Sequence, residues 1–373
     1  MPSLADDQSV VQRVLAHIEH GSTDLAPAVW REPVEHYLSA ARLDTEITRV
    51  MRRTPTPFCP SAALPAPGAY VAREAAGVPI LVVRGEDGQV RAFRNACRHR
   101  GMQVASGSGS AKAFACRYHG WTYALDGHLR QVPHEHGFPG LDRAAHGLVP
   151  VAVSERLGLV FVTQDAPAQD DAALDDLWPL VGPGQTLLAS SEQLVEANWK
   201  VMLEGFIEGY HIRSTHRETF YPYGFDNLNL VEYFGRNSRV TYPFRRIRKL
   251  AQVPPAERRV DGMLTYVYHL FPNVLITQLS RHTNVVVLEP QGVNRTLQIN
   301  YTLADLGDGE PEARAAALRD VEFVRQAGGA EDTEVICDIQ KSLNSRANQV
   351  FTFGLFEGAI SHFHRSLADL LES

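Results

Sequence analysis

The sequence predicts two kinds of fold in one chain: an all-β domain, followed by an α+β domain that combines an antiparallel sheet with helices. Short strand-like runs separated by Gly and Asp occupy residues 54–165. Further strand-like runs lie between residues 260 and 303, with helix-like segments before and after them, a pattern typical of α+β domains. The chain has 373 residues, 44% of them hydrophobic, which is enough for two or three domains with separate cores.

The first segment, residues 1–53, is expected to form a helical N-terminal extension. Apolar residues recur near the helical spacing between Val10 and Ile18, and again between Val34 and Ala41. These stripes predict amphipathic helices that bury one face.

Residues 54–165 are expected to form the small all-β domain. A Pro-rich stretch opens it, and the runs VPILVV and QVRAF flank the turn sequence RGEDG. The runs WTYAL and HLRQV flank Asp126 and Gly127, a dipeptide that is a strong hairpin signal. The strand-like run LGLVFVTQ (157–164) closes the domain.

The α+β domain is expected over residues 166–373, after a polar linker rich in Ala and Asp. The run ANWKVMLEGFIEGYH (197–211) is predicted to be helical. After the strands, the runs PEARAAALRDVEFVRQA and AEDTEVICDIQKSLNS predict two further helices, and a last helix is expected near 358–371.

Charge and composition exclude several classes of protein. The net charge is −7 and the charged residues are interspersed, which argues against nucleic acid as the main partner. Asp6 and Asp7 stand where a secretory signal would be positive, and VPILVV (78–83) is far too short to span a membrane. We therefore expect a cytoplasmic protein.

The four cysteines of the chain are too few for a disulfide framework in so long a chain, so metal binding is the first hypothesis for them.

Two loops offer a first set of metal ligands. Cys97 and His99 form a C-x-H pair, and Cys116 and His119 form a C-x-x-H pair, each followed by Gly within two residues. Two cysteines and two histidines can hold tetrahedral zinc. They can also hold a [2Fe–2S] cluster with two Cys on one iron and two His on the other.

The order of these ligands favours the cluster, because zinc fingers usually group Cys with Cys and His with His. The sequence CRHRG…CRYHGWTYALDG resembles the Rieske signature, although the family usually has Pro where Arg98 stands. The resemblance implies that Cys97, His99, Cys116 and His119 bind a Rieske [2Fe–2S] cluster.

A second candidate metal site lies in the segment E-x-x-H-x-x-x-x-H formed by Glu208, His211 and His216. On a regular helix, Glu208 and His211 would share a face with Glu204, while His216 would point about 140° away from His211. We therefore expect the chain to leave helical geometry after His211. Two imidazoles and one carboxylate can form the facial triad of non-haem Fe(II) oxygenases, which needs a third ligand from elsewhere.

The surrounding run NWKVMLEGFIEGYHIRSTH (198–216) resembles the catalytic domain of the Rieske non-haem iron oxygenase alpha subunits, which include ring-hydroxylating dioxygenases and quaternary-ammonium oxygenases. The resemblance covers most of the chain and implies a helix-grip fold for the second domain. It also implies a mononuclear Fe(II) held by His211, His216 and an Asp that opens a late helix. Asp332 fits that pattern best, with Glu331 and Glu334 as competitors.

The family usually has Asp where Glu208 stands, and Glu occurs there in oxygenases of quaternary ammonium compounds. The resemblance implies that Glu208 links a cluster histidine of one subunit to an iron ligand of its neighbour, so that electrons can cross. That role requires a ring of subunits, and we expect a homotrimer or a multiple of three.

The expected function is that of a terminal oxygenase. A separate NAD(P)H-dependent reductase or ferredoxin would supply electrons, and dioxygen would hydroxylate, dihydroxylate or demethylate a small aromatic or quaternary ammonium substrate. Aromatic residues between Phe206 and Phe225 and the basic run at 245–249 are candidates for substrate or partner contacts. Two alternatives remain at this point: a non-catalytic helix-grip binding protein with a zinc-stabilised β-domain, and a one-electron carrier with an inactive second site.

Overall fold

A computed structural model describes residues 4–165, 172–175, 177–280, 282–306 and 311–372. The chain divides into two compact units. The β unit is Arg52–Ala168, and the α+β unit combines Met1–Met51 with Gln169–Ser373. Among the described helices, none is both long and apolar enough to cross a membrane.

The β unit contains a seven-stranded and a three-stranded antiparallel sheet. The larger sheet has the strand order β2-β11-β10-β5-β4-β3-β6, and the smaller one has the order β7-β8-β9. The strands are β2 (Thr56–Pro60), β3 (Ala69–Ala75), β4 (Val78–Arg84), β5 (Val90–Arg94), β6 (Gly107–Ser110), β7 (Phe114–Ala115), β8 (Thr122–Tyr123), β9 (Leu129–Gln131), β10 (Pro150–Arg156) and β11 (Leu159–Thr163). Short 3-10 turns are η2 (Ser61–Ala63), η3 (Glu135–Gly137) and η4 (Ala144–His146).

The hairpin expected at Asp126 and Gly127 is present between β8 and β9. Gly127 has a φ of +87°, and a Cβ at this position would lie 2.4 Å from the ring of Phe93, so both the turn and the packing require glycine. The smaller sheet thereby packs closely against the larger one, and the two share a core that includes Cys97 and Cys116.

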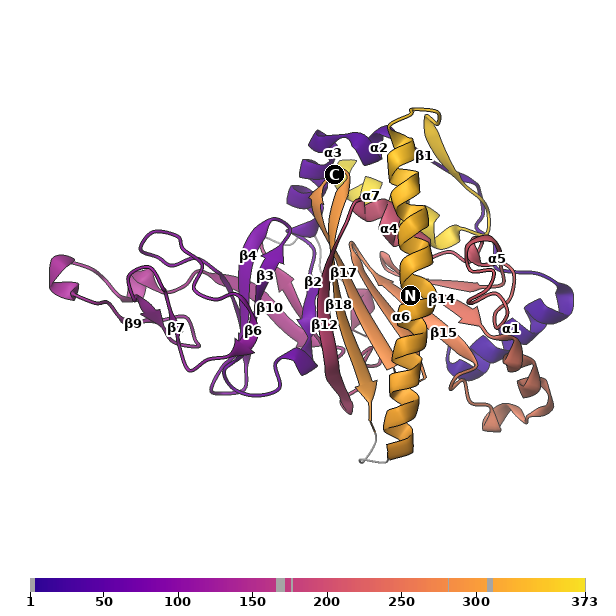
Figure 1. Cartoon of the computed structure of the whole chain (residues 1–373), viewed down its shortest axis with the longest axis horizontal. Coiled ribbons are helices and arrows are strands. Elements are labelled where there is room, and N and C mark those ends of the chain that lie inside the picture. The colour runs from indigo at the N-terminus through magenta and orange to yellow at the C-terminus, as the bar shows by residue number, and fades with distance from the viewer. Residues whose placement is uncertain (1–3, 166–171, 176, 281, 307–310, 373) are drawn as a thin grey trace. The chain divides into compact units, whose positions relative to one another are not determined.

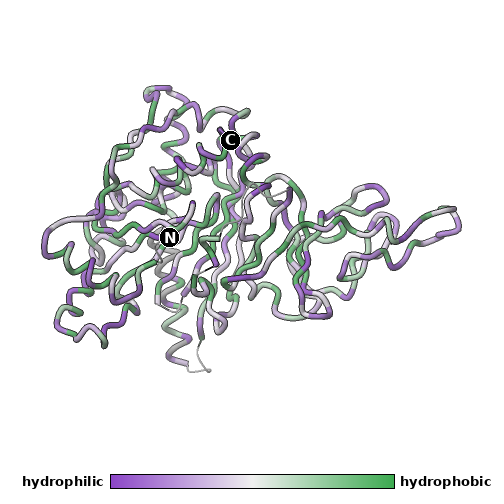
Figure 2. Tube along the Cα trace, turned by 180° about the vertical axis from the view of Figure 1, so that it is seen from behind, coloured by the Kyte–Doolittle hydropathy of each residue, from purple (hydrophilic) through white to green (hydrophobic). Residues whose placement is uncertain are grey.

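The α+β unit is built on a second seven-stranded antiparallel sheet with the order β12-β18-β17-β16-β15-β14-β13. Its strands are β12 (Gln185–Val195), β13 (Leu230–Phe234), β14 (Asn237–Pro243), β15 (Leu264–Leu270), β16 (Val274–Leu279), β17 (His282–Gly292) and β18 (Arg295–Asp305). The run Val285–Leu288 is buried at every position, because both faces of the sheet are covered here. Figure 2 shows hydrophobic stretches along the strands of this sheet, with hydrophilic ones between them.

Three helices pack on the sheet. The long helix α6 (Pro311–Leu343) runs over β17 and β18, as Figure 1 shows, and contacts α4 (Trp199–Phe206). The C-terminal α7 (Gly358–Glu372) packs on β13 and β14. This arrangement confirms the predicted α+β domain, in which helices are combined with an antiparallel sheet. The turn η5 (Ala172–Leu174) precedes β12, and the remaining elements after β12 are α5 (Ile212–Thr215), η6 (Arg245–Gln252), η7 (Pro255–Glu257) and β19 (Val350–Phe353).

The N-terminal segment belongs to the α+β unit. It contains α1 (Asp7–His20), β1 (Trp30–Pro33), α2 (Glu35–Leu38), α3 (Ala40–Thr45) and a π-helical turn η1 (Glu46–Met51). Strand β1 pairs with β19, near the other end of the chain. The extension is therefore part of the fold of the later residues.

The motif Asn198-Trp199-Lys200 anchors that extension. The Asn198 side chain caps α4 by accepting from Lys200 N, and donates to the carbonyl oxygen of Tyr37. Lys200 Nζ lies 2.6 Å from Glu46 Oε1, and both side chains are almost fully buried. The motif thus ties the start of α4 to the N-terminal segment.

Candidate metal centres

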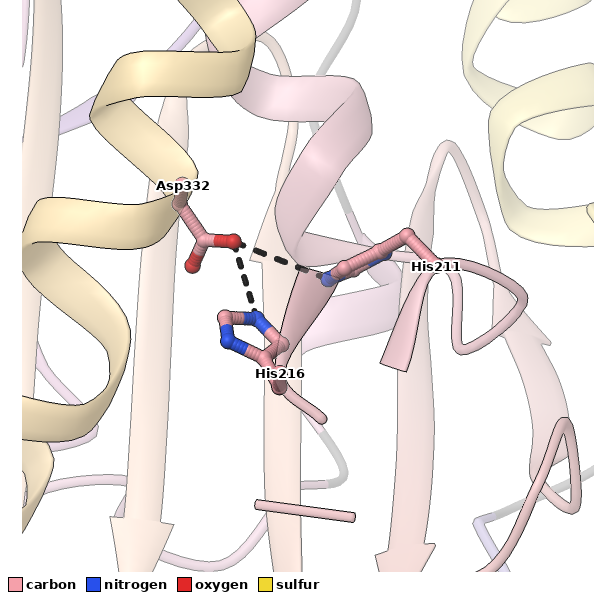
Figure 3. A group of neighbouring side chains, drawn as sticks. All are labelled: His211, His216 and Asp332. Atoms are coloured by element: carbon pink, nitrogen blue, oxygen red, sulfur yellow. Dashed lines mark ion pairs between the residues drawn. The ribbon is translucent and has the colours of Figure 1, made fainter. Parts of the chain in front are cut away.

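Three side chains of the α+β unit meet at one point. His211 and His216 flank the short helix α5, and Asp332 lies on α6. His211 Nε2 lies 3.7 Å from Asp332 Oδ1, and His216 Nε2 lies 2.9 Å from the same oxygen. Figure 3 shows both imidazoles turned toward this carboxylate, which projects from α6. Among the described residues, these three form the only group of three or more His, Cys, Asp or Glu side chains whose donor atoms all lie within 4.8 Å of one another. Two nitrogens and one oxygen suit a divalent iron and leave coordination positions open.

Each imidazole also forms a hydrogen bond with a second carboxylate, through the ring nitrogen that does not face Asp332. His211 Nδ1 donates to Glu208 Oε1, and Glu208 Oε2 also accepts from the backbone N–H of His211 at 3.2 Å. His216 Nδ1 donates to Glu331 Oε2 at 2.7 Å. Both rings therefore present Nε2 to the centre, the arrangement by which outer carboxylates orient metal-binding histidines.

The same carboxylates make the centre electronegative. Burial disfavours a charged imidazole at both histidines, but the hydrogen bonds and nearby negative charges outweigh it. The pKa of His211 is raised by Glu208 and Asp332, and the pKa of His216 is raised by Asp332 and Glu331. A site that favours a proton on each imidazole also favours a metal cation in its place.

The chain leaves helical geometry earlier than we expected. Helix α4 ends at Phe206, five residues before His211, rather than after it. The carbonyl oxygen of Phe206, at the end of the helix, accepts a hydrogen bond from Tyr242 OH at 3.0 Å. This bond satisfies one of the terminal acceptors of the helix. A Cβ on Gly209 would lie 2.7 Å from Asn229 Oδ1, so the segment passes close to its neighbours.

The short helix α5 then reverses the chain between the two histidines. His211 precedes it and His216 follows it, with His216 N donating to Ile212 O at 3.1 Å. This reversal brings His216 back toward His211, and the two ring centroids lie 5.1 Å apart.

Asp332 lies in the middle of a helix, not at its start. The two helices predicted around it are one continuous helix, α6. Glu331, considered above as a competing ligand, instead accepts from His216 and from Thr219 Oγ1 at 2.7 Å. Glu334 is exposed. An acidic neighbour of Asp332 was visible in the sequence, but the role of Glu331 depends on the fold of α5.

In the β unit, the two Cys/His loops have the same backbone turn. Cys97 O accepts from Gly101 N, and Cys116 O accepts from Gly120 N, both at 2.8 Å. The His99 and His119 ring centroids lie 4.6 Å apart, and His99 stacks on Trp121. The structure therefore brings the four predicted cluster residues into one region.

The donor geometry distinguishes a cluster from a single ion. In tetrahedral zinc sites the donor atoms lie about 3–4 Å from one another. Within the described part of the chain, which includes both loops, the two Cys and two His do not form such a convergent group. His99 Nδ1 is buried and makes no hydrogen bond to any described residue, as expected of an atom kept for a metal. The donor set fits a two-iron cluster better than the zinc alternative.

A tyrosine holds the first of these loops. Tyr123 OH lies 3.3 Å from Cys97 Sγ and accepts from Arg98 N at 2.8 Å. Burial and the neighbouring thiol raise the pKa of Tyr123, so the phenol keeps its proton. On the exposed side, Tyr118 stacks on His119 with 3.7 Å between ring centroids.

A buried polar network lies behind α4 and was not predicted. Glu204 Oε1 accepts from Tyr37 OH at 2.7 Å and from His364 Nε2 at 2.8 Å. His364 Nδ1 lies 3.4 Å from Glu32 Oε2. Glu204 therefore does not share a face with Glu208, and His364 joins α7 to the N-terminal extension. Nothing in the sequence spacing indicated this contact.

The fold and these two sites define the class. Residues 54–146 match the family model for the Rieske [2Fe-2S] domain, and residues 171–373 match the model for the ring hydroxylating alpha subunit (catalytic domain). The chain belongs to the ring-hydroxylating alpha-subunit family, and it is a Rieske non-haem iron oxygenase with a [2Fe–2S] cluster and a mononuclear iron as cofactors.

Particular relatives fall within this class. The chain is 27% identical to the carnitine monooxygenase oxygenase subunit of Escherichia coli (strain K12), with 92% of this chain and 94% of that protein covered. It is 40% identical to the glycine betaine monooxygenase oxygenase subunit of Chromohalobacter salexigens over 161 residues, which cover 42% of this chain and only 36% of that relative.

Solved structures show the same fold. The quaternary ammonium Rieske monooxygenase CntA, in complex with an inhibitor, superposes with a TM-score of 0.79 at 23% identity, covering 93% of this chain and 96% of that one. Naphthalene 1,2-dioxygenase with bound indole gives a TM-score of 0.77 at 20% identity, with 92% of each chain covered.

Proposed function

We propose that the protein is the terminal oxygenase of a quaternary ammonium monooxygenase system. The convergence of His211, His216 and Asp332, in a chain that also holds the Cys/His loops, carries the oxygenase assignment. The full-length similarity to carnitine monooxygenase and the partial similarity to glycine betaine monooxygenase support a small trimethylammonium substrate. Ring hydroxylation has less support from these relatives.

We assign the ligands residue by residue. Cys97, His99, Cys116 and His119 would hold the cluster, in a domain proposed to span residues 54–165. His211, His216 and Asp332 would hold Fe(II) in the domain proposed for residues 166–373, with residues 1–53 as its helical extension. When bound, the iron would supply the activation of dioxygen beside the substrate.

The residues around the centre would orient its ligands and pass electrons toward it. Glu208 holds His211 by Nδ1, and Glu331 holds His216 in the same way. We infer that Glu208 also gates electron transfer between a cluster in one subunit and the iron site of the next, because an outer-shell carboxylate can hydrogen-bond to a second imidazole. That role calls for a homotrimer or a multiple of three.

Electrons would come from a separate protein. The described residues contain no strand–loop–helix unit opened by a G-x-G-x-x-G sequence, so NAD(P)H is expected to bind a different polypeptide, a reductase or ferredoxin. Mono-oxygenation consumes two electrons and two protons, transferring one atom of dioxygen to the substrate and the other to water.

Oxygen uptake with a surrogate reductase tests the proposal. Glycine betaine, carnitine and choline are compared with naphthalene, and products are identified by mass spectrometry. We expect coupled uptake with at least one trimethylammonium compound, and its loss in Asp332→Ala but not in Asp338→Ala, which changes an exposed carboxylate of the same helix. Turnover of naphthalene alone would contradict the proposed substrate class.

A further inference from the structure

The carboxylate of Glu204, in the last turn of α4, joins two distant parts of the chain. Its Oε1 accepts from Tyr37 OH of α2 at 2.7 Å and from His364 Nε2 of α7 at 2.8 Å. All three side chains are buried, so water does not compete for these bonds. Hydrogen bonds to an ionised group are stronger than those between neutral groups. One carboxylate therefore fixes the last turn of α4 to both α2 and α7.

A second carboxylate stabilises charge on the imidazole of this network. His364 Nδ1 lies 3.4 Å from Glu32 Oε2, while its other ring nitrogen bonds to Glu204. Burial opposes a charge on His364, but the hydrogen bonds and charges of Glu204 and Glu32 outweigh it and raise its pKa. Glu32 also accepts from Trp30 Nε1 at 2.9 Å and pairs with His36 Nδ1 at 2.6 Å. The imidazole thus links two buried carboxylates, each of which has further partners.

The turn that carries Glu204 also contacts the helix of Asp332. A Cβ built on Gly205 would lie 3.7 Å from Ile336 Cδ1 of α6, so the backbone of Gly205 packs against this side chain. Ile336 is buried and stands one helical turn after Asp332. At the start of α4, Asn198 N donates to Gln340 Oε1 of α6 at 2.7 Å. Of these two contacts with α6, the one made by the last turn of α4 is the nearer to Asp332.

The chain continues from this turn directly into the metal site. Phe206 is the last residue of α4, and Glu208 and His211 follow it by two and five positions. His211 Nε2 lies 3.7 Å from Asp332 Oδ1, across the centre described above. A displacement of the last turn of α4 would therefore move His211 relative to Asp332.

We propose that Glu204, held by Tyr37 and His364, is a positioning residue of the iron site, which fixes the last turn of α4 on α6 and so sets the spacing between His211 and Asp332. Buried ion pairs add little stability over apolar side chains of similar size, and their best-attested use is to select one arrangement of the chain. The inference applies to any substrate of the enzyme, but it rests on the ligands assigned in the proposed function.

An equilibrium titration of the full chain with Fe(II), with the cluster in place, tests the inference. Glu204→Gln keeps the shape of the side chain and removes its charge. We expect it to weaken Fe(II) binding about five-fold, less than the ten-fold at the lower end for groups that touch a metal ligand. The EPR spectrum of the Fe(II) protein with nitric oxide should also change, because it reports the ligand geometry of the sites that hold iron.

Two further variants separate positioning from stability. Tyr37→Phe leaves the charges in place and removes one hydrogen bond, so it should weaken Fe(II) binding by a smaller factor, and it serves as the test if Glu204→Gln does not fold. Lys200→Met is the matched control, because it breaks another buried ion pair of α4, in the first turn of the helix. We expect it to lower stability and to leave the Fe(II) affinity and the EPR spectrum as in the parent protein.

The outcomes distinguish failure of this inference from failure of the ligand assignment. Unchanged Fe(II) affinity in either folded variant of the network, or equal weakening in Lys200→Met, would overturn the inference alone. Unchanged affinity in Asp332→Ala would reject the assigned ligands and overturn the inference with them. Weaker binding in Glu204→Gln and Tyr37→Phe, with Lys200→Met equal to the parent protein, would support it whichever substrate the enzyme uses.

Discussion

Glu331 offers a sharp test of how the iron site is held. Its Oε2 accepts two hydrogen bonds, from His216 Nδ1 and Thr219 Oγ1, both at 2.7 Å. Hydrogen bonds to a charged group contribute about 1.5–3 kcal/mol each, and the Glu331 side chain is 34% exposed, so water offsets part of the loss. Glu331→Gln keeps the shape and removes the charge. We expect iron affinity to fall about ten-fold, the lower end of the range for such outer carboxylates.

The assay is an equilibrium titration of the metal-depleted protein with Fe(II), with the cluster spectrum as an internal measure of folding. Glu334→Gln, an exposed position on the same helix, provides the matched control and should bind iron as the parent protein does. An unchanged iron affinity in Glu331→Gln would refute the reasoning. Complete loss of iron would instead make Glu331 a ligand, contrary to the geometry.

Three other predictions concern electron transfer and stability. Glu208→Gln should retain iron and a reducible cluster but slow single-turnover product formation, and a variant that loses its iron would show that Glu208 is needed for the metal site itself. Lys200→Met should lower the free energy of unfolding by about 3–5 kcal/mol in denaturant titrations, because it leaves Glu46 buried without its closest cation. A change below 1 kcal/mol would mean that Arg42 takes the place of Lys200 beside Glu46. Burial lowers the pKa of His269 to about 4, from an ordinary 6.5, so the unfolded state gains a proton before the folded state does as the pH falls. The protein should therefore lose about 3 kcal/mol of unfolding free energy through this histidine between pH 6.5 and pH 4. His269→Gln should reduce the slope of the unfolding free energy against pH over that interval. An unchanged slope would assign the acid sensitivity to other groups.

The sequence predicted most of the fold because its local signals agree with the tertiary structure. The runs around Asp126 and Gly127 form the expected hairpin. The strand-like runs predicted between residues 260 and 303 form the four consecutive strands β15 to β18. The loop with Cys97 and the loop with Cys116 could also be placed, because in each the spacing of Cys, His and Gly specifies a tight turn.

The remaining features depend on contacts between distant residues. Helix α4 ends at Phe206, whose carbonyl oxygen accepts from Tyr242 on β14, a residue 36 positions later in the chain. Asp332 could be chosen by family resemblance, but its place within α6 follows from the tertiary contacts of one continuous helix. Glu331 acquires its partner only after α5 turns His216 back toward it.

The α+β unit is discontinuous in sequence, and this has a consequence for biosynthesis. Strand β1 pairs with β19, so this pairing of the N-terminal segment cannot form until most of the chain has left the ribosome. The contact of Glu46 with Lys200 likewise waits for the later residue. The β unit is one continuous segment and can fold while the rest is still being made. The Cys/His loops can thus be formed before His211 and Asp332 exist, and cluster assembly can begin on a nascent chain that has no iron site yet.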